Sequence, residues 1–308
     1  MDTQKTATAI DGSFVLSQFD ALIKSGLVQF DENQKIIEYI DGDLKFHFVL
    51  TRALLQKPTL ATSRSQPSTE NQNATTSTIK HLQPGSDIDT NGFEIWDSNA
   101  SGHFLIANKF CFSRPHLMML TRDGFQRQYE PLNESDFEAS WGILNSLNSA
   151  AQDYVVFYNC GKDGGCSRLH KHVQLMPLPA CGFAVDFLNL EVSEKPSLPF
   201  KWFYHRLNGT GSPGQLNKIY FDLLQTTTKV WEESTGNNVA DGHACPHNVA
   251  FTNRWIVVIP RRCAAINKEA GVNSLGMLGI IAVATEKEID NWIQLGLTKS
   301  LAELGVPS

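Results

Sequence analysis

Residues 158–174 read YNCGKDGGCSRLHKHVQ, and the pattern around this stretch decides the predicted fold. An apolar run at Tyr154–Asn159 leads into a loop with three closely spaced glycines. A run whose polar and apolar positions alternate follows at Leu169–Met176. Alternation with a period of two is typical of a strand that is buried on one face. We therefore predict a strand, a glycine-rich loop and a second strand.

Polar side chains gather on one face of the second predicted strand. Because successive side chains point to opposite faces, His170, His172 and Gln174 share a face at intervals of about 7 Å. Lys171 lies on the other face. A neutral imidazole can attack phosphorus and form a phosphoramidate, which divides one displacement into two easier steps. A His-x-His pair alone is equally typical of a metal site or of a half-buried pair.

The glycine loop favours phosphate chemistry over those two alternatives. Glycines such as Gly161, Gly164 and Gly165 let backbone amides approach phosphates without a collision of side chains. Ser167 adds a hydroxyl donor, and the Gln174 amide adds another two residues beyond the second histidine. Donors positioned in this way stabilise the charge that moves during phosphoryl transfer.

Outside this stretch the chain mixes strands and helices along its whole length. Helices are predicted at Asp11–Gly26, from a capping box at Ser135–Glu138, at Ser212–Gly236 and from Thr285 onward. Further strands are predicted at Ile36–Ile40, Leu44–Leu50, His103–Phe112, Leu117–Thr121, Asn248–Thr252 and Trp255–Ile259. The predicted class is α+β with a mainly antiparallel sheet.

We predict one catalytic unit over residues 1–308, made of two packed parts at 1–200 and 201–308. Residues from about 59 to 79 are rich in Thr, Ser, Gln and Asn and contain no aromatic side chain. Such a segment cannot bury enough apolar surface to offset the entropy of ordering it. We therefore predict a disordered surface insertion within the first part.

Composition and charge exclude several classes of protein. The net charge is −6, with 26 Lys and Arg against 32 Asp and Glu, so a general nucleic-acid binder is disfavoured. The six cysteines are scattered without a Cys-x-x-Cys pair, which is typical of reduced thiols inside a cell. No signal peptide and no membrane-spanning run are predicted. We expect a cytoplasmic protein, with the nucleus as a further location.

The central stretch closely resembles the signature of a known family. Asn159, Gly161, Gly165–Ser167 and His170–Gln174 match the fungal ATP adenylyltransferases, the diadenosine tetraphosphate phosphorylases of the histidine-triad superfamily. Hexose-1-phosphate uridylyltransferases share the Ser-x-x-His-x-His-x-Gln core but usually have Pro between the histidines, so Lys171 favours the adenylyl branch. The resemblance extends over Leu54–Pro58, Asn108–Phe110, Thr121–Gln128, Pro131–Leu132, His247–Trp255 and Asn273–Gly276.

The resemblance implies a fold and a role for each matched position. The fold is the histidine-triad and uridylyltransferase type, a mainly antiparallel sheet flanked by helices. His172 is the implied nucleophile, and His170 and Gln174 are the other implied catalytic residues. The implied nucleotide- and phosphate-binding residues are Lys57, Asn108, Lys109, Asn159, Gly165, Cys166, Ser167, Arg168, Asn273, Ser274 and Leu275. Arg168 adds a charged donor or points to solvent, and both options stay open.

The implied reaction is ADP + ATP ⇌ phosphate + diadenosine tetraphosphate, running toward phosphorolysis through an adenylyl-histidine. The expected partners are ATP, ADP, diadenosine tetraphosphate and phosphate, with no nucleic acid and no membrane, and the expected state is a monomer. Mg²⁺ is expected to arrive with the substrate. The second imidazole nitrogen of His172 is expected to donate to a backbone carbonyl.

Two alternatives remain at this point, a hexose-1-phosphate uridylyltransferase and a nucleotide sensor with weak turnover. The sensor is kept open by Ile280 and Ala284, which stand where the family pattern usually has Met and Lys.

Three other features are candidates for a functional role: the His243, Cys245 and His247 group, the Arg261-Arg262 pair, and Lys109. His243, Cys245 and His247 could bind a soft metal, but tetrahedral zinc needs a fourth ligand that the spacing does not supply. No protein-bound zinc is expected, and His247 is predicted to begin a core strand. Arg261-Arg262 are predicted to be solvated charges at a sheet edge. Lys109 follows a buried apolar run and is expected to meet an anion.

Overall fold

The structure is a computed structural model that describes residues 11–57, 82–98, 102–148, 152–179, 187–188, 196–207 and 211–308. The insertion predicted at about residues 59–79 lies wholly outside these ranges. Among the described residues, no helix combines the length and the apolar character needed to cross a membrane.

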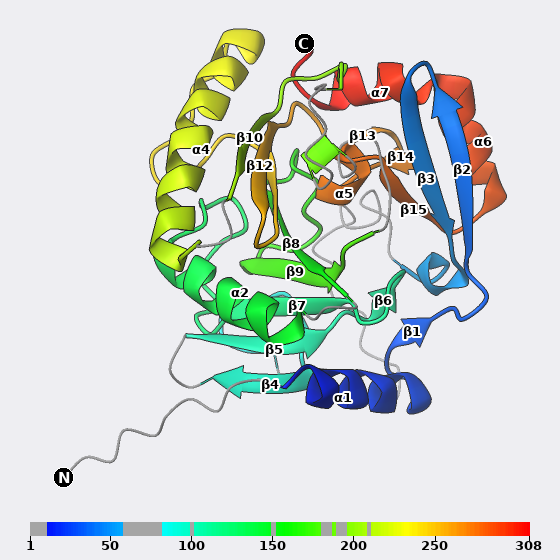
Figure 1. Ribbon diagram of the computed structural model, residues 1–308, viewed down its shortest axis with the longest axis vertical. Coiled ribbons are helices and arrows are strands. Elements are labelled where there is room, and N and C mark those ends of the chain that lie inside the picture. The colour runs from blue at the N-terminus through cyan, green and yellow to red at the C-terminus, as the bar shows by residue number, and fades with distance from the viewer. Residues whose placement is uncertain are drawn as a thin grey trace, which may run out of the picture.

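One large sheet forms the centre of the molecule (Figure 1). Its strands are β4 (Glu94–Ser98), β5 (His103–Ala107), β7 (Leu117–Thr121), β8 (Tyr154–Cys160), β9 (His172–Pro177), β10 (Phe203–Arg206), β11 (His247–Phe251) and β12 (Trp255–Pro260). The order is β10-β12-β11-β8-β9-β7-β5-β4, and every pairing is antiparallel. The predicted fold class is therefore confirmed. Strands from before residue 200 and after residue 201 share this sheet.

The predicted hairpin at residues 36–50 is confirmed and joins a second, smaller sheet. Strand β2 (Lys35–Asp41) pairs antiparallel with β3 (Leu44–Leu50), and β15 (Ile280–Val283) pairs parallel with β3 on its other side. Two short pairs complete the strands: β1 (Gln29–Phe30) with β6 (Phe110–Cys111), and β13 (Ala265–Asn267) with β14 (Ala270–Gly271). The single strand predicted at His103–Phe112 is wrong, because the Asn108 Oδ1 atom accepts from the Phe110 amide and turns the chain between β5 and β6.

The helices divide between the two faces of the large sheet (Figure 1). Their bounds are α1 (Gly12–Lys24), the 3-10 turn η1 (Arg52–Leu54), α2 (Glu134–Leu147), α4 (Pro213–Thr235), α5 (Ser274–Met277), α6 (Glu286–Leu295) and α7 (Leu297–Leu304). The capping box predicted to start at Ser135 is wrong by two residues. Asn133 caps α2, and its side chain and that of Asp136 bond each other's backbone amides reciprocally.

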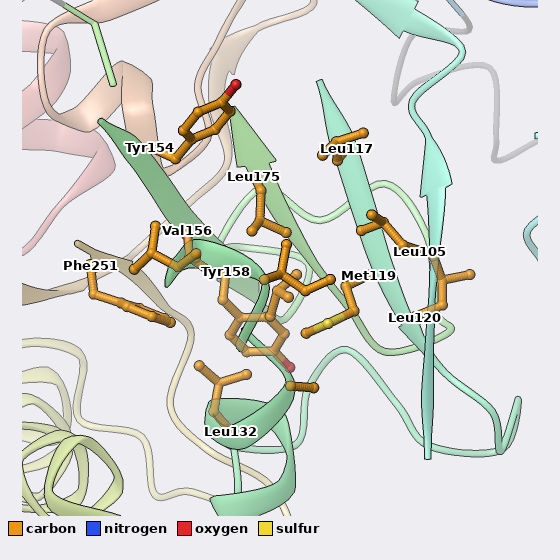
Figure 2. Packing of buried hydrophobic residues seen from close by; sticks show 14 of the residues in the cluster. Leu105, Leu117, Met119, Leu120, Leu132, Tyr154, Val156, Tyr158, Leu175 and Phe251 are labelled. Atoms are coloured by element: carbon orange, nitrogen blue, oxygen red, sulfur yellow. The ribbon is translucent and has the colours of Figure 1, made fainter. Parts of the chain in front are cut away.

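Two hydrophobic cores lie on opposite sides of the large sheet. The first joins the sheet to α1, α2 and α4, and Figure 2 shows Val156, Tyr158 and Leu175 within it, close to Leu132 and Phe251. The second joins the other face to β3, β15, α5, α6 and α7. Neighbouring residues of one strand therefore enter different cores. In β9, Val173 and Leu175 pack in the first core, while His172 and Gln174 point to the opposite face.

Candidate active site

Strand β9 carries His172 and Gln174 in the predicted alternation, but the predicted start at Leu169 is wrong by three residues, so His170 precedes the strand. Val173 and Leu175 enter the first core, while Met176 enters the second. The regular strand begins at His172, and His170 makes only an isolated bridge to Arg127. The His170, His172 and Gln174 face of the strand is therefore turned away from α2 and α4.

The ring of His172 is held in one tautomer. Its Nδ1 atom lies 2.8 Å from the His170 carbonyl oxygen, which can only accept, so Nδ1 carries the proton and donates it. Burial lowers the pKa of His172 to about 4, so the ring is neutral near pH 7. The expected bond to a backbone carbonyl is thus present, and the Nε2 lone pair is left as the nucleophilic position.

His170 supports this arrangement from a position that is fully buried. Its Nε2 lies 2.9 Å from the Thr121 carbonyl oxygen, so Nε2 donates there. Its Nδ1 lies 2.8 Å from the Ser86 hydroxyl and therefore accepts from it. Both ring nitrogens are occupied, and the group that His170 offers to His172 is its backbone carbonyl.

An aspartate that the sequence did not single out fixes the backbone before β9. The two carboxylate oxygens of Asp87 accept from the Leu169 amide and the His170 amide, each at 2.9 Å. Ser86 and Asp87 come a few residues after the low-complexity segment, in a stretch without any periodic pattern that would have predicted a role for them. The only signal was the turn-forming Gly85-Ser86-Asp87 sequence itself.

A second missed residue, His116, orients Gln174. The His116 Nε2 atom lies 3.0 Å from the Gln174 Oε1 atom and donates to it, so the Gln174 NH₂ group points elsewhere as a donor. Asn108 Nδ2 lies 3.3 Å from the same ring nitrogen. Burial lowers the pKa of His116 to about 4, and the charge of Lys57 acts in the same direction. Two predicted site residues, Asn108 and Gln174, therefore meet at His116, and the charge of a third, Lys57, acts on the same ring.

The glycine loop needs its glycines for close packing. Gly161 and Gly165 have φ angles of 75° and 89°, in the left-handed region that favours glycine. A Cβ atom on Gly164 would lie 2.1 Å from the Cys160 carbonyl oxygen, and one on Gly165 would lie 2.8 Å from the Val272 carbonyl oxygen. The loop is thus pressed between β8 and the segment that precedes α5.

Asn159 joins the two halves of the chain beside this loop. Its Oδ1 atom accepts from Asn248 Nδ2 at 3.1 Å, from the Ser274 amide at 2.9 Å and from the Ser274 hydroxyl at 2.7 Å. These bonds all use Oδ1, so Nδ2 is the donor that Asn159 can offer to a ligand. The predicted contribution of Ser274 is therefore indirect, through the orientation of Asn159.

The other predicted binding residues are placed as follows. Asn273 caps α5, with Oδ1 accepting from the amides of Leu275 at 3.1 Å and Gly276 at 3.2 Å, and Leu275 is buried in the second core. Cys166 is half-buried in the loop, and burial raises the pKa of its thiol to about 11. Exposed residues are found at Lys109, Ser167 and Arg168. Lys57 is also exposed over the residue as a whole, but burial around its ammonium group lowers its pKa.

Two of these exposed residues have a described contact. Arg168 Nη1 lies 3.4 Å from the Asp87 carbonyl oxygen, so this side chain follows the surface beside β9. Lys109 Nζ lies 5.6 Å from the centre of the Phe110 ring. Its expected anion remains a prediction.

The features interpreted structurally have mixed outcomes. His247 begins β11 as predicted, with Nδ1 bonded to the Cys245 carbonyl oxygen and Nε2 to the Tyr220 hydroxyl. His243 stacks on Tyr129. The interpretation of Arg261 as a solvated charge is wrong, because its side chain is completely buried, whereas Arg262 is exposed.

The two departures from the family pattern lie beside the second core. Ile280 is buried there and pairs with His47 across the small sheet. Ala284 uses its amide to donate to the Glu288 carboxylate.

Comparison with known proteins matches nearly the whole chain to one family. Residues 28–187 match the Ap4A phosphorylase N-terminal domain, and residues 196–307 match the ATP adenylyltransferase C-terminal domain. The chain therefore belongs to the family of Ap4A phosphorylases and ATP adenylyltransferases that these two domains define.

Individual relatives agree with this assignment. Over 238 residues the chain is 29% identical to diadenosine 5',5'''-P1,P4-tetraphosphate phosphorylase 2 of Saccharomyces cerevisiae, covering 69% of this chain and 72% of the relative. The crystal structure of yeast Ap4A phosphorylase Apa2 in complex with AMP superposes with a TM-score of 0.73 at 21% identity, over 97% of this chain and 98% of that one. The complex of the same protein with Ap4A gives 0.72 at 20% identity, over 98% and 99%. The last two likenesses concern the fold.

Proposed function

We propose that the protein is an ATP adenylyltransferase that phosphorolyses diadenosine tetraphosphate to ATP and ADP through an adenylyl-His172 intermediate. The observation that carries the proposal is the state of His172 in a chain of this family. The ring is neutral, its Nδ1–H is held by the His170 carbonyl oxygen at 2.8 Å, and Nε2 is thereby the reactive nitrogen.

The reaction runs in two displacements at one phosphorus. His172 Nε2 forms a bond to the α-phosphorus of diadenosine tetraphosphate, and the bond from that phosphorus to the bridging oxygen breaks, so ATP leaves. A phosphate oxygen then attacks the same phosphorus, the N–P bond breaks, and ADP leaves. Each step inverts the configuration, so the net outcome is retention.

Donors around β9 are proposed to stabilise the phosphorus-bound oxygens. The Gln174 NH₂ group is turned toward this role because His116 holds its oxygen. Asn159 Nδ2 and the loop amides from Gly165 to Arg168 would hold the phosphates of the transferred nucleotide, and Lys57 and Lys109 those of the leaving one.

A divalent cation such as Mg²⁺ is proposed to arrive on the polyphosphate and to neutralise part of its charge. Within the described ranges, no three His, Cys, Asp or Glu side chains form a group that could hold a metal ion.

The test is direct. The purified protein, incubated with phosphate, Mg²⁺ and diadenosine tetraphosphate, should release equal amounts of ATP and ADP. Incubation without phosphate, followed by a base quench, should trap AMP on the protein, and the bond should be acid-labile. His172→Ala should abolish both signals, with Lys162→Ala as an exposed control in the same loop. An unchanged adduct in His172→Ala would rule the proposal out, and so would a UMP adduct formed from a UDP-sugar in a parallel incubation when no AMP adduct forms from diadenosine tetraphosphate.

A further inference from the structure

Arg261 is a completely buried cation at the end of β12. Its guanidinium donates only to neutral oxygens. Nε bonds the Leu304 carbonyl at 3.2 Å, and Nη1 bonds Asn248 Oδ1 at 2.5 Å. Nη1 and Nη2 both lie 3.2 Å from the Val272 carbonyl oxygen, and Nη2 lies 2.8 Å from that of Cys263. Every N–H direction is therefore used, but no acceptor is an anion.

Across the residues that the structure describes, Arg261 forms no ion pair. Taking a charge out of water is costly unless a charge of opposite sign is placed beside it. Burial lowers the pKa of Arg261 to about 10, while the nearby groups Cys263 and Asp163 oppose that shift without a direct contact. Asp163 itself is exposed on the glycine loop. Among the described residues, this buried cation therefore has no carboxylate in contact with it.

The partners of Arg261 place it directly behind the phosphate loop. Asn248, which accepts from the guanidinium, donates through Nδ2 to Asn159 Oδ1 at 3.1 Å and to the Gly164 carbonyl at 2.6 Å. The Val272 carbonyl is the same atom against which Gly165 packs. One cation therefore anchors the groups that orient the loop and the Asn159 amide.

We propose that Arg261 is a positioning residue whose buried charge is balanced by the phosphates of the bound nucleotide, so that it gives the site its preference for polyanionic ligands over neutral nucleosides. The identity of the ligand rests on the proposed function, but the need for a negative charge does not. Hydrogen bonding from Arg261 would fix Asn248, and through it Asn159, while the charge acts through the poorly solvated protein behind the loop.

The first test compares ligands that differ only in charge. Affinities for ATP, AMP and adenosine are measured by calorimetry for the wild type, Arg261→Met, Arg261→Lys and the exposed neighbour Arg262→Met. Removing a unit charge from a poorly solvated position beside the site should change ATP affinity by about tenfold or more. Arg261→Met should therefore weaken ATP by at least about tenfold, AMP by less, and adenosine by under about threefold. Arg261→Lys should recover most of the loss, and Arg262→Met should behave as wild type.

Kinetics separate this role from a purely structural one. Loss of the charge should raise KM for diadenosine tetraphosphate and lower kcat less, with Arg261→Lys restoring KM. If Arg261 only supports the loop, Met and Lys variants should lose ATP and adenosine affinity alike, and the proposal fails.

A second variant keeps the test decisive if Arg261→Met does not fold. Cys263 lies two residues after Arg261 and is half-buried, and a charge on it would interact electrostatically with the guanidinium. Cys263→Asp would supply a counter-charge without removing a hydrogen bond of Arg261, whereas Cys263→Asn is the neutral control. The Asp variant should have a Tm equal to or above that of the Asn variant. ATP should raise the Tm of the Asp variant by less than that of the Asn variant, and should bind the Asp variant at least about threefold more weakly.

Equal ATP affinities in the two Cys263 variants, together with adenosine affinities equal to wild type, would overturn the proposal. Failure of the proposed function has a different signature, since a wild type that binds ATP but forms no adduct would leave these binding comparisons intact.

Discussion

Lys171 provides a sharp test of how β9 separates stability from chemistry. It stands between His170 and His172 but points to the opposite face, where it is buried. Its Nζ lies 2.7 Å from Asp136 Oδ2 and 2.7 Å from the Pro131 carbonyl oxygen. Burial raises the pKa of Asp136, but the His103 hydrogen bond and the Lys171 charge outweigh it and lower that pKa overall. We predict that Lys171→Met destabilises the fold and leaves the chemistry nearly intact.

The size of the loss follows from what remains around Asp136. Methionine keeps the length of the lysine stem, so little packing is lost. The carboxylate keeps His103 at 2.9 Å and the Asn133 amide at 2.9 Å but loses its charged partner. Removing one member of a buried pair typically costs about 3–5 kcal/mol. For a chain of this size the expected fall in Tm is roughly 6–20 °C.

The assay is a double-mutant cycle with Asp136→Asn, read by denaturant unfolding, with exposed Lys201→Met as control. The double variant should be more stable than the sum of the single losses by about 2 kcal/mol or more, because neither charge is then left alone. Adenylylation per folded molecule of Lys171→Met should stay within about threefold of wild type. Normal stability with lost adenylylation would show that Lys171 acts on the reaction, and the reasoning would be refuted.

Three further predictions concern the site and its surroundings. Gln174→Ala should slow adenylylation and de-adenylylation by on the order of 10²-fold with little change in nucleotide affinity, because a preorganised donor is lost; rapid-quench rates within about threefold of wild type would contradict this. Because burial lowers the pKa values of His116, His172 and His247 to about 4 from 6.5, the unfolded chain binds more protons between these values. Stability should therefore fall as pH drops through this window, by up to about 4 kcal/mol per pH unit for three protons, and denaturant titrations showing a slope below one proton would exclude it. Deleting residues 63–77 should leave Tm and turnover nearly unchanged, and a loss of soluble protein would show the polar composition to be misleading.

The parts of the site that were predictable follow from short-range periodicity. The face shared by His172 and Gln174 depends only on strand alternation, and the hairpin at residues 36–50 on two alternating runs around a turn. The cap of α2 was misplaced because Ser135 and Asn133 are comparable capping residues. Only the path of the chain decides which of them precedes the first helical turn.

What could not be predicted depends on contacts between distant segments. Arg261 is buried because the Leu304 and Val272 carbonyls converge on it, from 43 and 11 residues further along the chain. His116, which directly precedes β7, becomes part of the site because β7 pairs with β9. This pairing brings His116 to Gln174, which is 58 residues away in the sequence. A strand-end arginine or an isolated histidine has no local pattern that reveals such a partner.

The same local device occurs twice in this molecule, with different consequences. His172 donates from Nδ1 to the carbonyl two residues before it, and His247 does the same with Cys245 at 2.7 Å. Both rings are buried and neutral, with pKa values lowered to about 4. The two differ at Nε2, which in His247 accepts from the Tyr220 hydroxyl at 3.0 Å. A fixed tautomer prepares a nucleophile only where the second lone pair is free, and among the described residues no hydrogen bond to His172 Nε2 is found. For His172 we propose that this lone pair attacks phosphorus.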